Sequence, residues 1–236
     1  QYYQIISKYT HLIFSDYKDI KLCLKNINVS GEIPKSHESK YNRLINTNNL
    51  NLKYLILGDN FNHQIKPNDK LEILKLGKKF NQPITLTKSL KIIIFGQNFN
   101  HQIELNEKLV KIKFGYYFNK PIKLSNQLKV ILFGDSFNNP IDLPLHKIDF
   151  IEFGYMFNQP IELKNCKIEC LRFWGLFNQS IELNKTLKKL YLSTSFSYPI
   201  KLNENLVELY VGDRYNYPID LTDKLTKLYL GNDFNQ

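Results

Sequence analysis

Hydrophobic and polar residues alternate along this chain in a pattern that repeats every 19 or 20 residues. Each copy follows the order Leu-x-x-Leu-x-Phe-Gly-x-x-Phe-Asn-x-Pro-Ile-x-Leu, and a short polar turn leads to the next copy. Such self-similarity predicts a solenoid in which each coil packs only on its neighbours. The period is marked by the aromatic residues Phe61, Phe80, Phe99, Phe118, Phe137, Phe157, Phe177, Phe196, Tyr215 and Phe234.

Two stretches of every copy alternate with the period of two that is typical of a β-strand. The first stretch predicts parallel strands at residues such as 92–95, 111–114 and 130–133. The second contains an isoleucine that recurs in every complete copy, as at Ile141, whereas the following residue varies in charge. We therefore expect this isoleucine inside the coil and its neighbour outside.

Proline at the entry to the second stretch predicts a weaker backbone ladder on that side, because proline has no N–H to donate. A coil of this length also leaves little room for a helix beside two extended stretches and two turns. We therefore expect β-strand on one side of the coil and extended or 3₁₀ backbone on the other.

Glycine and asparagine hold fixed places around the recurring aromatic residue. Glycine follows the first stretch, where we expect a sharp bend with positive φ. The asparagine amide can satisfy backbone groups of the turn and pair with the asparagine one coil away, which favours a structural role. A row of exposed amides that bind a ligand is the alternative. The glycines are Gly58, Gly77, Gly96, Gly115, Gly134, Gly154, Gly212 and Gly231.

The pattern resembles the FNIP repeat family, which is related to leucine-rich repeats. Its signature Phe-Asn-x-Pro-Ile stands at residues 80–84 and 157–161 and recurs in phase over about residues 52–236. The resemblance implies a leucine-rich-repeat-like open β-solenoid of about ten coils, with a parallel β-sheet on one side. It also implies a protein of a slime mould or of a giant virus that infects amoebae, and the abundant Asn, Ile and Lys indicate an AT-rich genome. Many members carry an N-terminal F-box, which recruits a ubiquitin ligase.

The pattern divides the chain near residue 51. Residues 52–236 are predicted to form the repeat solenoid, which stops within a copy. Residues 1–51 are interpreted as degenerate N-terminal coils together with an inserted polar loop over residues 34–50. No initiator Met and no closing cap is present, so we expect the chain to be part of a longer protein.

Composition narrows the range of partners and compartments. The net charge of +10 on its own favours an acidic partner such as nucleic acid. The lysines, however, are spread around the coil and mixed with Asp and Glu, which argues against nucleic-acid binding. Three cysteines without framework spacing favour a reducing compartment, so we expect a cytoplasmic protein, in the host cytoplasm or the virion if it is viral. No stretch is long and apolar enough to span a membrane.

The sequence contains no arrangement of residues that is typical of an enzyme. His63 and His101 share a repeat position, but two coils separate them by about 10 Å, too far to ligate one metal. Cys166 and Cys170 have no further ligands at zinc spacing. Phosphate loops, nucleotide fingerprints and nucleophile elbows are also absent. We therefore expect no catalytic residues, no cofactor and no metal.

The outward side of the first stretch is richer in aromatic residues than solubility requires. Trp174 replaces the repeat glycine, so the core pattern does not require its side chain, and earlier copies place Ile56, Ile73 and Ile92 on the same outward side. Aromatic residues beside isolated cations compose binding hot spots. The alternative is that tyrosine and isoleucine simply favour β-sheet faces and stabilise the ladder. The candidate partner-binding residues are Tyr116, Tyr117, Tyr155, Met156, Arg172, Trp174, Leu176, Tyr191, Tyr210 and Tyr229.

These patterns predict a non-enzymatic scaffold that binds another protein through the outward strand face. A second hypothesis is a structural protein, for example virion-associated, that assembles with copies of itself, because an uncapped solenoid end exposes backbone and apolar surface. A third hypothesis follows from the resemblance alone: the complete protein would be the substrate-recognition part of an F-box ubiquitin ligase subunit.

Overall fold

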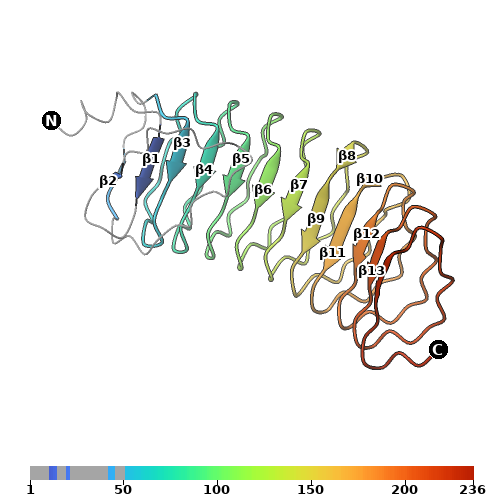
Figure 1. The fold of residues 1–236 in the computed structure, drawn as a ribbon. Coiled ribbons are helices and arrows are strands. Elements are labelled where there is room, and N and C mark those ends of the chain that lie inside the picture. The colour runs from blue at the N-terminus through green and yellow to red at the C-terminus, as the bar shows by residue number, and fades with distance from the viewer. Residues whose placement is uncertain (1–10, 15–19, 22–41, 46–50) are drawn as a thin grey trace. The chain divides into compact units, whose positions relative to one another are not determined.

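A computed structural model describes residues 11–14, 20–21, 42–45 and 51–236 of this protein, and only the backbone of the first two segments. The chain divides into two compact units, Gln1–Gly115 and Tyr116–Gln236. Each unit is a parallel β-solenoid (Figure 1), and the described residues contain no helix. The fold class expected from the repeat is therefore confirmed in both units.

The strands of the first unit lie side by side in the order β2-β1-β3-β4-β5-β6. β1 pairs antiparallel with β2 and parallel with β3, and every later pair is parallel. Leu74 pairs with Ile93, nineteen residues later, so one coil advances the sheet by one strand. The bounds are β1 His11–Phe14, β2 Ile20–Lys21, β3 Tyr54–Ile56, β4 Ile73–Lys75, β5 Ile92–Ile94 and β6 Lys111–Lys113.

The second unit has two parallel sheets. The main sheet runs β7-β9-β11-β12-β13-β14, and β8 pairs with β10 in a sheet of two strands. The extra pair arises in the two coils that are 20 residues long, whose additional residue falls in the turn before the main strand. The bounds are β7 Val130–Leu132, β8 Lys147–Ile148, β9 Phe150–Phe153, β10 Lys167–Ile168, β11 Cys170–Phe173, β12 Lys189–Tyr191, β13 Glu208–Tyr210 and β14 Lys227–Tyr229.

The two sides of each coil differ as the prolines predict. The strands expected at residues 92–95, 111–114 and 130–133 are present, each one residue shorter at its carboxyl end. The second stretch forms neither a strand nor a 3₁₀ helix within residues 51–236. Its recurring isoleucine nevertheless faces the core, and Ile103 and Ile141 are 4% and 8% exposed.

A column of aromatic rings fills the centre of each solenoid. In the second unit Phe157 lies between Phe137 and Phe177, with ring centroids 6.0 and 6.1 Å away and interplanar angles of 5° and 9°. All three rings are fully buried. A second phenylalanine, at the end of the strand, closes on the first, and the Phe153 and Phe157 centroids are 4.0 Å apart. Stacking between coils therefore buries the faces of the aromatic rings, which a single coil would leave exposed to solvent.

The recurring asparagines form a ladder of hydrogen bonds from coil to coil. The Asn62 Oδ1 accepts the backbone N–H of Asn81, at 2.9 Å, and Asn158 accepts from Asn178 at the same distance. The same oxygens accept a second bond from a following Gln side chain, as Asn158 does from Gln179. The structural interpretation of these asparagines is therefore confirmed.

The repeat glycines serve a purpose other than the expected one. Of the glycines described, only Gly175 has positive φ, at 57°. At six other glycines a side chain would collide with the preceding coil, and a Cβ on Gly96 would lie 1.8 Å from the backbone oxygen of Gly77. These six are Gly77, Gly96, Gly115, Gly154, Gly212 and Gly231. The prediction of positive φ at this position was wrong, because at these six glycines it is the close approach of the preceding coil, and not the backbone conformation, that excludes a Cβ.

Replacing Ser197 by asparagine is expected to raise thermal stability by about 1–3 °C. Ser197 donates its backbone N–H to Asn178 Oδ1 at 2.9 Å but has no amide oxygen to offer the next coil. The ladder resumes only with Asn216, which accepts from Asn235. Calorimetry of Ser197→Asn beside Ser197→Ala measures the effect. Equal melting temperatures for the two variants would contradict it.

The proposed division at residue 51 stays a prediction. Most of residues 1–50 lie outside the described part of the chain, including Cys23 and the greater part of the expected loop over residues 34–50. Within that loop, residues 42–45 are described, and Asn42 Oδ1 accepts the backbone N–H of Asn62 at 3.0 Å. Asn42 thus occupies the place in the ladder that an asparagine of a preceding coil would hold.

Candidate functional site

The outward strand face differs between the two units. In the first unit Ile56, Ile73 and Ile92 are 1%, 4% and 7% exposed. The expectation that they contribute to an open surface was wrong, because all three side chains are buried. Burial likewise lowers the pKa of the Lys75 amine. In the second unit Tyr210 and Tyr229, which stand at the repeat position of Ile56, are 39% and 49% exposed.

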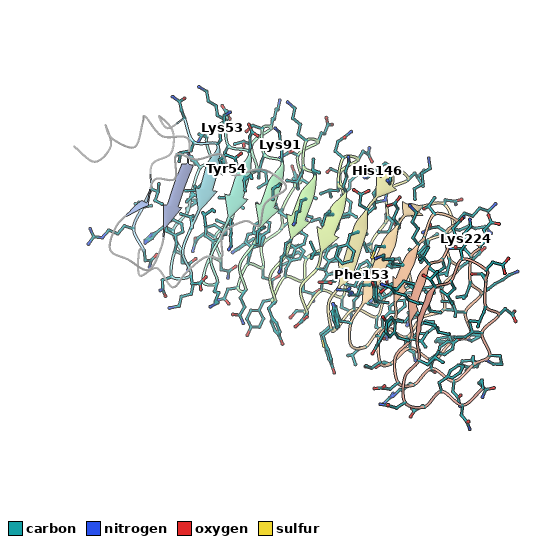
Figure 2. The ribbon with its side chains drawn as sticks, in the orientation of Figure 1. Lys53, Tyr54, Lys91, His146, Phe153 and Lys224 are labelled. Atoms are coloured by element: carbon teal, nitrogen blue, oxygen red, sulfur yellow. The ribbon has the colours of Figure 1, made fainter. Side chains whose placement is uncertain are left out.

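The open part of this face centres on the coil in which Trp174 replaces the repeat glycine. The backbone N–H of Trp174 donates to the backbone carbonyl of Phe153 at 3.1 Å. This bond continues the ladder between β11 and β9 by one residue. Phe153 marks the carboxyl end of β9 (Figure 2). The turn then begins at Gly175, whose positive φ allows the chain to reverse. A one-residue shift of glycine thus lets a large side chain stand at the bend.

A pocket of about 370 Å³ opens beside this altered bend. Its volume lies at the small end of the range for ligand sites, which suits one or two side chains. It is open to solvent on one side and follows the carboxyl ends of three consecutive main strands. The lining residues are Arg172, Phe173, Trp174, Gly175, Tyr191, Leu192, Ser193, Thr194 and Tyr210.

Arg172 is the centre of the pocket. Its guanidinium carbon lies 4.4 Å from the ring centroid of Tyr191, 5.4 Å from that of Trp174 and 5.7 Å from that of Phe150. Its Nη1 is 3.2 Å from Glu152 Oε2. Three aromatic rings and one carboxylate therefore hold a cation in place.

Glu208 supplies a second carboxylate at the edge of the pocket. Its Oε1 accepts the Tyr191 hydroxyl at 2.8 Å, and its Oε2 lies 3.4 Å from the Lys189 Nζ and 3.8 Å from the Lys227 Nζ. The hydrogen bond from Tyr191, followed by the lysines, lowers the pKa of Glu208. Burial and the same bond raise the pKa of Tyr191. Glu208 is thus held ionised and Tyr191 protonated at neutral pH.

The other predicted residues lie around the pocket or apart from it. Tyr155 packs on the bend itself, since a Cβ on Gly175 would lie 2.4 Å from the Tyr155 ring. Tyr229 lies beside Tyr210, with centroids 6.2 Å apart. The residues that are exposed in neighbouring bends are Met156 and Leu176.

Tyr116 and Tyr117 form a separate exposed pair. Their rings meet edge to face with centroids 4.8 Å apart. Both are nearly half exposed, at 46% and 49%. Among the described residues of the second unit, neither a ring contact nor a hydrogen bond joins this pair to the Arg172 pocket. Of the predicted surface residues, these two therefore stand outside the cluster.

Sequence reasoning predicted Arg172 but missed the other polar residues in and beside the pocket. Glu152 and Arg172 occupy the same position in consecutive coils, so the repeat alignment placed opposite charges side by side. The same alignment places Glu208 between Lys189 and Lys227, which was the available signal for that ion cluster. Ser193 stands where most copies have glycine, which was an available signal, whereas Thr194 offered none.

The two histidines that share a repeat position have structural roles in the turns. His101 Nε2 lies 3.1 Å from the Asn81 backbone oxygen, and His63 makes the equivalent contact with Asn42, so both support the turn. Within residues 51–236 and the shorter described segments, no three His, Cys, Asp or Glu side chains converge as metal ligands. The same residues contain no helix that could cross a membrane.

Comparison with known proteins agrees with the repeat architecture. Residues 80–117 match the family model described as the FNIP repeat, which confirms the resemblance over these residues. No curated protein matches the chain.

Proposed function

We propose that this protein is a non-enzymatic protein–protein interaction scaffold whose contact surface is the open strand face of the second unit. One observation carries the proposal: Trp174, Tyr191 and Tyr210 surround Arg172 in a pocket that remains open to solvent. The cytoplasmic location expected from the cysteine content belongs to the same proposal.

The composition of this surface supports binding rather than solubility alone. Trp174 is 51% exposed although the repeat places a glycine there. Tryptophan, tyrosine and arginine are the residues that contribute most to binding at interfaces. The parallel strands beneath them hold these side chains at fixed spacing, so little conformational entropy is lost when a partner binds.

Changing both Tyr155 and Trp174 to alanine is expected to abolish partner binding and leave the melting temperature within about 2 °C of the wild type. Both side chains are at least half exposed, and Trp174 already carries a Cβ, so alanine fits its backbone. The measurement is affinity capture on the immobilised chain from an extract of its source cells, followed by titration with the purified partner.

The matched control changes Tyr198 and Tyr217, which are 41% and 38% exposed, to alanine. This control should bind the partner like the wild type. If the two double variants bind the partner equally well, the open strand face is not the contact surface. A collapse of stability in the first variant would instead identify Tyr155 and Trp174 as part of the core.

Light scattering over a concentration series distinguishes a foreign partner from a second copy of the chain. The scaffold proposal expects a constant mass for the isolated chain. A mass that rises with concentration, and that the Tyr155 and Trp174 changes reduce, would favour self-assembly.

A further inference from the structure

We infer that the Arg172 pocket binds an acidic side chain of the partner protein, with an adjacent apolar side chain of the same segment lying against Trp174 and Tyr210. This inference rests on the proposed function and specifies the chemistry of its partner. It requires a guanidinium with donors beyond the one that Glu152 engages, a local charge that fits one carboxylate, and apolar walls beside the guanidinium.

The guanidinium retains hydrogen-bonding capacity for a ligand. An arginine has five N–H donors in a planar fork, and Glu152 contacts Arg172 through Nη1. Glu152 is the one carboxylate that pairs with Arg172 among the residues the structure describes. The side chain is still 31% exposed at the floor of the pocket. Stacking on Tyr191 fixes the plane of the fork, so the remaining donors are held in place for a carboxylate.

The local charge fits a single negative group. Arg172, Lys189 and Lys227 contribute three positive charges, and Glu152 and Glu208 contribute two negative charges, which leaves +1. Both oxygens of Glu208 are already engaged by neighbours. The single negative charge of a carboxylate matches this excess of +1. A phosphate dianion exceeds it and would be repelled by the carboxylates of Glu152 and Glu208. A cationic ligand is disfavoured because Arg172 already occupies the faces of the aromatic rings.

The walls of the pocket are apolar and exposed. Trp174 and Tyr210 present 51% and 39% of their surface to solvent. Thr194 lines the same pocket and provides a hydroxyl at its rim. A volume of about 370 Å³ holds a carboxylate side chain and part of one apolar neighbour rather than a cofactor. An acidic residue next to an aromatic or aliphatic one is therefore the segment that fits.

The test selects peptides from a displayed library of random dodecamers against the full chain. Trp174 is the only tryptophan of the protein, so its emission reports occupancy of the pocket directly. We expect the selected peptides to contain Asp or Glu beside a large apolar residue and to change Trp174 fluorescence on titration. Replacing the acidic residue of a selected peptide by its amide should weaken binding about tenfold or more.

Arg172→Gln should weaken the same peptides about tenfold or more, and Arg172→Lys should restore only part of the loss because lysine lacks the planar fork. The control Lys201→Gln removes an exposed charge on the second stretch and should change affinity by less than about twofold. Circular dichroism and melting temperature verify that each variant is folded.

Selected peptides without an acidic residue, or peptides that bind Arg172→Gln as tightly as the wild type, would overturn the inference. Failure to select any peptide would overturn it as well. None of these outcomes affects the proposed function, which depends on capture of a whole partner by the Tyr155 and Trp174 surface. Conversely, if peptides bind at Arg172 but no protein partner is captured, the carboxylate site is supported and the proposed scaffold function is contradicted.

Discussion

Replacing Phe157 by alanine is expected to lower the free energy of unfolding of the second unit by about 3–5 kcal/mol. The ring is fully buried and lies against four others, those of Phe137, Phe153, Phe173 and Phe177, with centroids 4.0 to 6.2 Å away. Removing it deletes a large buried side chain and leaves a cavity between two coils. Rigid stacking on both sides prevents the neighbouring coils from closing that cavity.

Urea denaturation followed by circular dichroism measures this loss, and Trp174 fluorescence reports the same unit. Phe157→Leu is the matched control, because leucine keeps most of the buried volume and is expected to cost less than half as much. A loss below about 1 kcal/mol for Phe157→Ala would mean that the column relaxes freely and that stacking contributes little to stability.

Gly96→Ala is expected to destabilise the first unit by about 1–3 kcal/mol or more. The new Cβ would lie 1.8 Å from the Gly77 carbonyl oxygen and 2.3 Å from its carbon, and both are backbone atoms of a stacked coil. Those atoms can move away only if the coils separate, which weakens the ladder on either side. Denaturation of the variant, monitored by circular dichroism, gives the magnitude.

The sign of this effect distinguishes two explanations of the repeat glycine. Gly96 does not have positive φ. If close stacking were unimportant, alanine would restrict the unfolded chain and stabilise the protein by about 0.4–1 kcal/mol. Gln97→Ala, at the exposed neighbouring position, serves as the control and should be nearly neutral. A stabilised Gly96→Ala variant would contradict the packing explanation.

The period of the sequence was sufficient to predict the sheet and its register. Each strand pairs with the equivalent strand one coil on, as Leu171 does with Leu190, because a fixed period aligns identical positions. The prolines correctly indicated which side of the coil would lack a ladder. The glycines were misinterpreted, since a sequence shows that a side chain is absent but not which neighbouring atom excludes it.

The candidate site was predictable in its residue types and not in its geometry. Trp174 stood out because it broke the glycine pattern, and Arg172 because it is an isolated cation among aromatic residues on the outward side of the strands. The turn at residues 175–176 occupies the same place as the turn at 155–156 one coil earlier, but the positive φ of Gly175 within it is not encoded by any residue pattern. The burial of Ile56, Ile73 and Ile92 was equally hidden, since alternation assigns a face and not what packs on it.

The asparagine ladder has a consequence for how such a chain changes in length over evolution. Each asparagine receives a hydrogen bond from the coil after it and donates its own N–H to the coil before it, as Asn158 does between Asn138 and Asn178. A duplicated gene segment of one period would therefore carry its own donor and its own acceptor wherever it was inserted within the ladder. Coil number can grow or shrink by whole periods without creating an unmatched group, while the residues that recognise a partner diverge coil by coil.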